Sequence, residues 1–543
     1  MRRGPREAAS FPKHAAQRGK RRELQHPRRG RAAEKRRVLP AGRSYHPATL
    51  DGRAAFVASL ECSTMVDSAR SFPLVIQGGM GVGVSGWRLA RAVSCAGQLG
   101  VVSGTVADVL LARRLEDGDP GGHLRRALAA FPIPGVAERV LERYFRRAGR
   151  PADSPYTAIP MLRQDLDVER EQLILAGTFA EVYLAREGHD GAVGLNLLAK
   201  VQLPTLASLY GAMLAGVDYV LMGAGIPREI PGVLDRLAAH EPVSLRLDIQ
   251  GPGAAEQVCF DPNRHGALHT QPLARPRFLA IVSSNSLATL LARKSTGRVD
   301  GFVIERPSAG GHNAPPRGDA GLSERGEPMY GERDAVDLAA LRALGLPFWI
   351  AGGAGAPAAL ADALAASAAG IQVGTLFAFC DESGLAPDLR RTVLASAREG
   401  TLDVLTDPLA SPTGYPFKIA ACRDALVEPA TRTRVCDLGY LRTAYRRADG
   451  SVGHRCPAEP IEAYVAKGGA ESDTVGRRCL CNALLASAGY GQLRHDGTTE
   501  SPVITAGDQA KDLRPFLAGR QSYAARDVLD YLLAGVLARS TSA

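Results

Sequence analysis

Between residues 73 and 380, short apolar runs alternate with segments of helical periodicity, and this alternation limits the fold more than any other feature. Most runs precede a helix-like stretch, as expected for parallel strands joined by crossover helices. Eight such units in about 300 residues predict an α/β protein with a (β/α)₈ TIM barrel, and a doubly wound open sheet is the alternative. The eight runs lie at 73–79, 99–105, 191–198, 218–225, 277–284, 300–311, 347–355 and 370–375.

The rest of the chain divides around this barrel. Two longer stretches, at about 106–188 and 240–276, are expected to be insertions, and the apolar run 243–249 lies in the second. Residues 381–543 lack the strand–helix rhythm and are rich in turns, Arg, Tyr and Cys, so they are expected to form a mainly helical cap region packed against the barrel. The predicted divisions are therefore a tail (1–64), the barrel (65–380) and the cap region (381–543).

The positive charge of the chain is concentrated in its first 43 residues. They carry fifteen Lys and Arg against three Glu, a net charge of +12, whereas the whole chain has +10. Without periodic apolar residues this tail is expected to be disordered. It could bind nucleic acid, act as an Arg-rich transit peptide, or result from a start codon assigned too early, with translation beginning near Met65. The last interpretation is favoured because nothing after the tail resembles a nucleic-acid reader.

Composition predicts a soluble protein. Hydrophobic residues make up 45% of the chain and charged residues 22%, and no apolar run reaches the ~18 residues of a membrane span. The tail has no apolar core of a secretory signal, so a cytoplasmic location with cysteines as thiols is expected. No nucleic-acid or membrane partner is predicted, and the sequence does not indicate an oligomeric state.

Four of the nine cysteines, Cys436, Cys456, Cys479 and Cys481, fall within 46 residues. Structural zinc sites usually present pairs at C-x₂₋₄-C. Here the only close pair is C-x-C, and the remaining spacings are 20 and 23 residues. Buried thiols are the default interpretation, with zinc or an iron–sulfur cluster as the alternative, and no metal ligand is predicted.

Glycine-rich turns follow most of the predicted strands. In such barrels the loops after the strands form the active site, and those after strands seven and eight commonly bind phosphate. Here these loops contain Gly352–Gly353 and Gly374–Thr375, whose amides and hydroxyl could bind a phosphate without a lysine. The chain has no P-loop motif, and the glycines after strand one do not fit a dinucleotide fingerprint. FMN, with one phosphate and a flat ring, fits better.

Five motifs in this order and spacing resemble the nitronate monooxygenase family, once called 2-nitropropane dioxygenases. They are "IQGGMGVGVSGW", "GLNLL", "SAGGHNAP", "AGGAG" and "IQVGT", and the likeness covers about residues 73–380. The resemblance implies an FMN-dependent oxidoreductase that oxidises alkyl nitronates with dioxygen to a carbonyl compound and nitrite. Its partners would be a small-molecule substrate and dioxygen.

The resemblance also implies a set of site residues. His312 falls on the family's AGGH histidine and is the predicted catalytic residue, as a base or an orienting group near flavin N5. A histidine that only hydrogen-bonds the loop is the alternative. The predicted cofactor-binding residues are Gly78, Gly79, Met80, Asn196, Gly311, Gly352, Gly353, Gln372, Gly374 and Thr375.

Several features differ from the simpler nitronate enzymes. The first motif reads "IQGGM" where the family commonly has I-Q-A-P-M, "NAPPRG" follows the histidine, and the insertions and C-terminal region are long. These features resemble the enoyl-reductase component of polyunsaturated fatty acid and polyketide synthases. They imply an alternative function, an FMN-dependent enoyl-thioester reductase with an acyl carrier protein as partner. A flavin-binding module within a larger synthase is a third reading.

The roles of four further residues and one segment are considered next. Glu305 could face the cavity or a helix, and Arg317 could bind an anionic group or be solvated. Asn313 is expected to shape its turn. Trp87 is expected to pack rather than stack on a flavin. The segment 410–418 could act as a lid or merely join helices.

Overall fold

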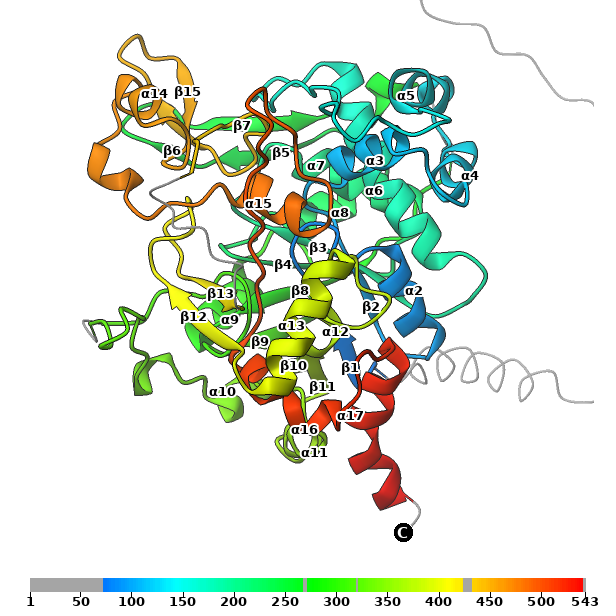
Figure 1. The fold of residues 1–543 in the computed structure, drawn as a ribbon, viewed down its shortest axis with the longest axis vertical. Coiled ribbons are helices and arrows are strands. Elements are labelled where there is room, and N and C mark those ends of the chain that lie inside the picture. The colour runs from blue at the N-terminus through cyan, green and yellow to red at the C-terminus, as the bar shows by residue number, and fades with distance from the viewer. Residues whose placement is uncertain (1–71, 267–270, 319–320, 423–431, 541–543) are drawn as a thin grey trace, which may run out of the picture. The chain divides into compact units, whose positions relative to one another are not determined.

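The described chain is built around a parallel β-barrel. The computed structural model describes residues 72–266, 271–318, 321–422 and 432–540, so the predicted basic tail and Met65 lie outside it. Eight strands follow one another in the order β1-β11-β10-β9-β8-β4-β3-β2. The N–H of Leu99 donates to the carbonyl of Val75 at 3.1 Å, and the N–H of Gln77 donates to that of Leu99 at 2.9 Å. These bonds join β1 to β2, so the predicted (β/α)₈ barrel is confirmed (Figure 1).

Each of the eight predicted apolar runs contains one barrel strand. The strands are β1 (Val75–Gln77), β2 (Gly100–Ser103), β3 (Val193–Leu198), β4 (Tyr219–Gly223), β8 (Arg277–Val282), β9 (Gly301–Glu305), β10 (Phe348–Ala351) and β11 (Gly370–Val373).

Two helices of the ring around the barrel come from segments outside the simple strand–helix repeat. α6 (Val168–Arg186), at the end of the first insertion, packs against α2 (Trp87–Cys95) and α7 (Thr205–Leu214). α17 (Ala525–Ser540), at the C-terminus, packs against α11 (Pro357–Ala365) and α2, where the short α12 (Thr375–Ala378) cannot cover the sheet. The other helices of the ring are α8 (Ile230–Ala238), α9 (Asn285–Lys294) and α10 (Leu338–Arg342).

Both expected insertions have structure of their own. The first contains α3 (Ala107–Glu116), α4 (His123–Ala129) and α5 (Val136–Tyr144), which cover the outer side of α6. This cover explains why α6 is buried along most of its length instead of showing one apolar face. The second insertion contains the hairpin β5 (Val243–Leu247) and β7 (Glu256–Phe260), together with the short strand β6 (Ile249–Gln250).

The described residues of the C-terminal region pack with the barrel in one compact unit. Besides α17 its helices are α13 (Pro387–Glu399), α14 (Ile461–Ala466), α15 (Leu480–Ser487) and α16 (Leu513–Leu517). It also contains two antiparallel strand pairs, which were not among the elements predicted from the sequence. They are β12 (Asp403–Asp407) with β13 (Phe417–Ala421), and β14 (Thr443–Arg446) with β15 (Val452–Arg455). Because β14 also pairs with β6, the second insertion and the C-terminal region share a small sheet.

The barrel strands divide their side chains between two apolar clusters. In β8, Leu279 belongs to the cluster inside the barrel, whereas Phe278 and Val282 belong to the cluster between strands and helices. This division follows from the two-residue repeat of a strand. The inner cluster includes the fully buried Trp349, whose indole N–H donates to the carbonyl of Pro73 at 2.8 Å. The barrel interior is therefore a packed core, and a ligand must bind at its rim.

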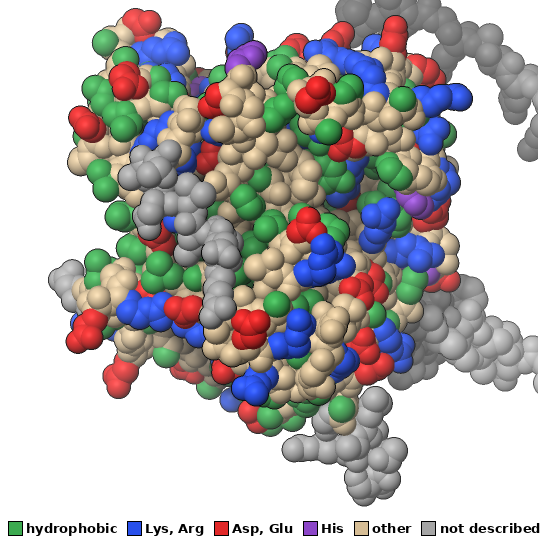
Figure 2. Space-filling model, viewed as in Figure 1, with side chains coloured by type: hydrophobic (Ala, Val, Ile, Leu, Met, Phe, Trp, Pro, Cys, Tyr) green, Lys and Arg blue, Asp and Glu red, His purple; other side chains and the backbone are tan. Residues whose placement is uncertain are grey.

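Charges of both signs are interspersed over the face drawn in Figure 2. This distribution agrees with the sequence outside the first 43 residues, where acidic and basic residues nearly balance. Among the described residues, no helix has the length and apolar character needed to span a membrane.

We expect Leu279→Ala to lower the free energy of unfolding by about 2–5 kcal/mol, because it leaves a cavity inside the barrel. Urea denaturation followed by far-UV circular dichroism measures the change. Leu322→Ala, at a position with 59% of its surface exposed, is the matched control and should change little. Equal destabilisation by the two variants would contradict the assignment of Leu279 to the core.

Candidate active site

A single cavity lies at the carboxyl ends of the barrel strands and gathers all eleven site residues predicted from the sequence. It encloses an empty volume of about 1340 Å³, including its open mouth, so it has room for a ligand of nucleotide size. The eleven residues are Gly78, Gly79, Met80, Asn196, Gly311, His312, Gly352, Gly353, Gln372, Gly374 and Thr375. They come from the ends of β1, β3, β9, β10 and β11, which the closed sheet brings to one rim.

The loop after β1 approaches β3 so closely that only glycine fits at one position. A Cβ atom on Gly79 would lie 2.3 Å from Cβ of Asn196, well inside van der Waals contact. Ser85 holds this loop in place. Its hydroxyl oxygen accepts hydrogen bonds from the N–H of Met80 at 2.9 Å and from Nε2 of Gln77 at 2.9 Å. The backbone of Gly79 and the side chain of Asn196 therefore form one continuous wall.

Gln372 leaves a polar atom unsatisfied on this cavity. Its Oε1 is buried and has no hydrogen-bond partner within the described parts of the chain. Buried amide oxygens are rarely left without a donor, because the lost hydration is not replaced. A ligand with an N–H or O–H group at this wall would supply the missing donor.

The loop that carries His312 is clamped by the C-terminal region. The N–H of Lys418 donates to the carbonyl of Gly311 at 2.9 Å, and the N–H of Gly311 donates to Oγ1 of Thr505 at 2.9 Å. The imidazole makes an edge contact with Phe417, with ring centroids 4.9 Å apart. The segment 410–418 thus contributes Phe417, the first residue of β13, to the site wall, rather than simply joining two helices.

A serine hydroxyl binds the histidine directly. Nε2 of His312 lies 2.7 Å from Oγ of Ser411, which is fully buried and lies 2.8 Å from Oγ1 of Thr413. Burial lowers the pKa of His312 to about 4, because a charged imidazolium would lose its hydration. At neutral pH the ring is therefore uncharged, with one N–H and one lone pair.

Glu305, at the end of β9, faces the same cavity. Burial raises the pKa of its carboxyl group to about 8, since the carboxylate would be poorly solvated there. The side chain is thus a neutral acid at pH 7 that can donate a hydrogen bond or a proton. The sequence left its orientation open, and the structure decides for the cavity.

The segment 505–509 closes the wall next to the predicted phosphate loops, although no sequence motif predicts that it lies there. The N–H of Gly507 donates to Oγ1 of Thr375 at 3.0 Å, and Oε1 of Gln509 accepts the N–H of Gly355 at 2.9 Å. A Cβ on Gly507 would lie 2.6 Å from the carbonyl oxygen of Ser308, so this contact requires glycine. No signal in "TAGDQ" points to a contact with loops some 130–200 residues earlier.

Three residues weighed in the sequence analysis lie outside the cavity lining. Arg317 binds carbonyl oxygens of Ser283 and Arg333, so its guanidinium stabilises the loop. Asn313 is buried, and its amide donates to the carbonyl of Ala309 at 3.0 Å, in agreement with a turn-shaping role. Trp87 packs against His123, with ring centroids 4.9 Å apart.

Comparison with known proteins adds a family match. Residues 247–410 match the family model of nitronate monooxygenase. The expected resemblance is confirmed over this stretch, which contains His312, and with it the prediction that the chain is an oxidoreductase. Gly78, Gly79, Met80 and Asn196 lie outside the matched stretch. No curated protein matches the chain.

Similar solved structures include FabK, a nitroalkane oxidase and an enoyl reductase domain. FabK from Thermotoga maritima is 15% identical, with a TM-score of 0.44, and the match covers 88% of this chain and 97% of that chain. Nitroalkane oxidase from Streptomyces ansochromogenes is 17% identical, with a TM-score of 0.42 and coverage of 87% and 98%. The enoyl reductase domain of MlnA from Bacillus amyloliquefaciens is 12% identical, with a TM-score of 0.42 and coverage of 86% and 95%.

The raised pKa of Glu305 makes stability depend on pH. Its pKa is about 8 in the folded protein against an ordinary value of 4.5, so the folded state holds the extra proton and loses stability as pH rises toward 8. The lowered pKa of His312 has the opposite effect, raising stability as pH rises, but only below pH 6.5, the ordinary pKa of a histidine. We therefore expect Glu305→Gln to flatten the fall in urea midpoint between pH 6.5 and 8. Glu138→Gln, on the exposed side of α5, should keep the wild-type slope, and equal slopes in all three proteins would contradict the assignment.

Proposed function

We propose that the protein is an FMN-dependent oxidoreductase that oxidises alkyl nitronates with dioxygen to a carbonyl compound and nitrite. One observation carries this proposal: the glycine-rich ends of the strands and His312 of the AGGH loop line the same cavity. The match of residues 247–410 to the nitronate monooxygenase family model supports it.

The residues present fit a flavin. The backbone of Gly79 lies directly against the side chain of Asn196 at the cavity wall, so a flavin ring could lie against these two residues. The unsatisfied Oε1 of Gln372 calls for a ring N–H, which flavins carry. At the phosphate wall, Thr375 accepts the N–H of Gly507 yet retains its own hydroxyl hydrogen to donate. Consecutive left-handed glycines, Gly352 (φ 86°) and Gly353 (φ 66°), allow the backbone there to turn toward an anion.

When bound, the flavin would supply the electron-transfer chemistry between nitronate and dioxygen. The chain's own residues bind and orient the substrate. A neutral imidazole with a pKa of about 4 is a weak base, so it is poorly suited to remove a proton from carbon. It is well suited to donate one hydrogen bond to an oxygen of a nitronate, which is already an anion. Of the two predicted roles for His312, this argument favours the orienting one.

One observation favours the second candidate, enoyl-thioester reduction. Reduction of a carbon–carbon double bond requires a proton as well as a hydride, and Glu305 is a cavity-facing acid that is protonated at pH 7. The nitronate reaction has no comparable need for an acid. Glu305 therefore offers a residue by which the two functions can be separated.

The test begins with the absorption spectrum of the full chain supplied with FMN. We expect bound flavin and oxygen consumption with propionate-3-nitronate, exceeding that with the neutral nitroalkane because no effective base is present. Gly79→Ala should lose flavin binding, since the added Cβ would overlap Asn196. Gly331→Ala, where a Cβ meets nothing within 4 Å, is the matched control and should retain it.

Absence of bound flavin after FMN addition would reject both functions. Inactivity on nitronates, together with NAD(P)H-driven reduction of an enoyl thioester that Glu305→Gln abolishes, would reject the nitronate reaction and support the second candidate.

Ser411→Ala should lower kcat about 2- to 12-fold, because a neutral hydrogen bond that holds His312 contributes about 0.5–1.5 kcal/mol. KM should change less, and flavin content should not change. Ser411→Thr, which restores the hydroxyl, should recover part of the loss. Ser396→Ala, at a buried serine of α13 remote from the cavity lining, is the control. Loss of flavin or of the fold in Ser411→Ala alone would show that the serine is structural.

A further inference from the structure

Four cysteines from three separate segments line one small cavity in the C-terminal region. Cys436 precedes β14, Cys456 follows β15, and Cys479 and Cys481 lie at the start of α15. The cavity between them has an empty volume of about 280 Å³. Three of these cysteines are buried and Cys436 is partly buried, and all four are free thiols. We therefore name these four residues the cysteine cluster.

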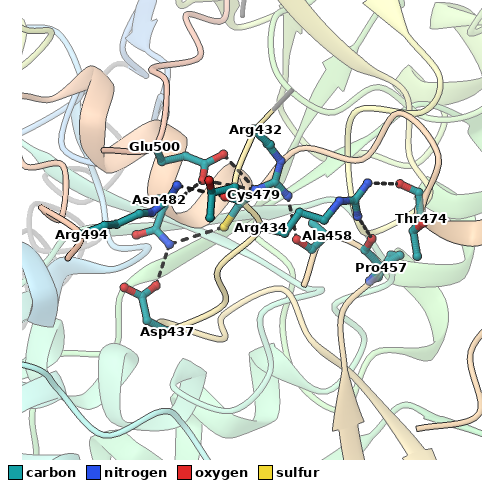
Figure 3. Close-up of polar contacts among 11 residues, drawn as sticks. Arg432, Arg434, Asp437, Pro457, Ala458, Thr474, Cys479, Asn482, Arg494 and Glu500 are labelled. Atoms are coloured by element: carbon teal, nitrogen blue, oxygen red, sulfur yellow. Dashed lines mark hydrogen bonds and ion pairs between the residues drawn. The ribbon is translucent and has the colours of Figure 1, made fainter. Parts of the chain in front are cut away.

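Polar contacts hold the three segments together next to the cysteines (Figure 3). Nδ2 of Asn482 donates to Oδ1 of Asp437 at 2.6 Å and to Sγ of Cys479 at 3.6 Å, so it joins the first segment to the third. Asp437 is the neighbour of Cys436 in the sequence.

Two arginines join the first segment to the second in the same way. Nη2 of Arg432 donates to the carbonyl of Ala458 at 2.7 Å, and Nη1 of Arg434 donates to that of Pro457 at 3.0 Å. These carbonyls belong to the two residues after Cys456 (Figure 3). The convergence of the cysteines is therefore fixed by contacts on either side of the cavity.

We propose that the cysteine cluster binds one thiophilic metal ion, Zn²⁺, through four thiolates. On binding, four S–H groups release their protons to solvent and four Zn–S bonds form, with no change of oxidation state. The complex of Zn²⁺ with four thiolates has a net charge of −2. Arg442 lines the cavity, and Arg432 and Arg434 hold the adjoining segments. The positive charge of these arginines would partly balance the negative charge of the complex.

The spacing of the cysteines in the sequence does not exclude this site, because the ligand geometry depends on where the segments meet in the fold. Within the described residues, no three Cys, His, Asp or Glu side chains already form a group that could hold a metal. Binding therefore requires the sulfur atoms to turn inward from the lining of the cavity. Cys χ1 rotation moves a sulfur without moving the tethered backbone.

The proposed metal would brace the wall of the active-site cavity. Pro412, which follows the serine that binds His312, lines the cysteine cavity. Arg477, just before Cys479, donates to the carbonyl of Ser411 at 2.6 Å. Leu484 of α15 lines the active-site cavity itself. Loss of the metal should therefore loosen Ser411 and lower turnover as well as thermal stability.

The test is the metal content of the purified full chain, which can be read without any enzymatic assay and so does not depend on the proposed function. We expect one zinc per chain, retained on dialysis and released when a mercurial titrates the thiols. Cys479→Ser and Cys456→Ser should lose most of this zinc. Cys422→Ser, at a buried cysteine of the same region outside the cluster, is the matched control and should retain it.

Should the serine variants fail to fold, the wild-type chain still decides the question. Protein produced with Co²⁺ in place of zinc should show thiolate-to-cobalt charge-transfer bands and the visible bands of a tetrahedral ion. X-ray absorption of the zinc form should give four sulfur ligands at about 2.3 Å. Metal-free protein with a normal melting temperature, zinc retained by Cys479→Ser, or iron with acid-labile sulfide in place of zinc would each overturn the proposal.

Discussion

Closure of the eight-stranded sheet is the constraint on which the other features of this protein depend. Two backbone hydrogen bonds around Leu99 join the first strand to the second and turn an open sheet into a barrel. Because all strands are parallel, their carboxyl ends then lie on one rim. Glycine-rich turns that are up to 300 residues apart in the sequence thereby become the walls of one cavity. An open sheet would have spread the same turns along an edge.

The C-terminal region completes this barrel rather than standing beside it. α17 packs in the gap between α11 and α2, and the segment 505–509 binds the loops after the last strands. Nζ of the buried Lys418 pairs with Asp508 at 2.8 Å, which ties β13 to that segment. Since one partner of this ion pair is fully desolvated, removing Asp508 would leave a buried charge unpaired. The loop carrying His312 is thus held from both sides by residues of the C-terminal region.

Burial gives the cavity two neutral titratable groups. It lowers the pKa of His312 to about 4 and raises that of Glu305 to about 8, for the same reason, since either charged form would lose hydration. At neutral pH these two side chains therefore offer hydrogen bonds rather than fixed charge to a ligand in the cavity. Such a site can hold an anion through donors without a permanent counter-ion.

The sequence by itself determined the eight strands, because each needs a short apolar run and the runs are local. It also determined the glycine-rich turns and the position of His312, because glycine pairs and a histidine after a strand can be recognised from the sequence alone. Only the tertiary structure decided which helices cover the barrel, since α6 and α17 are separated from their neighbours by an insertion and by the whole C-terminal region. It alone decided the contacts of Ser411, Gly507 and Gln509 and the convergence of the four cysteines. These depend on long-range packing, which the local pattern of residues does not encode.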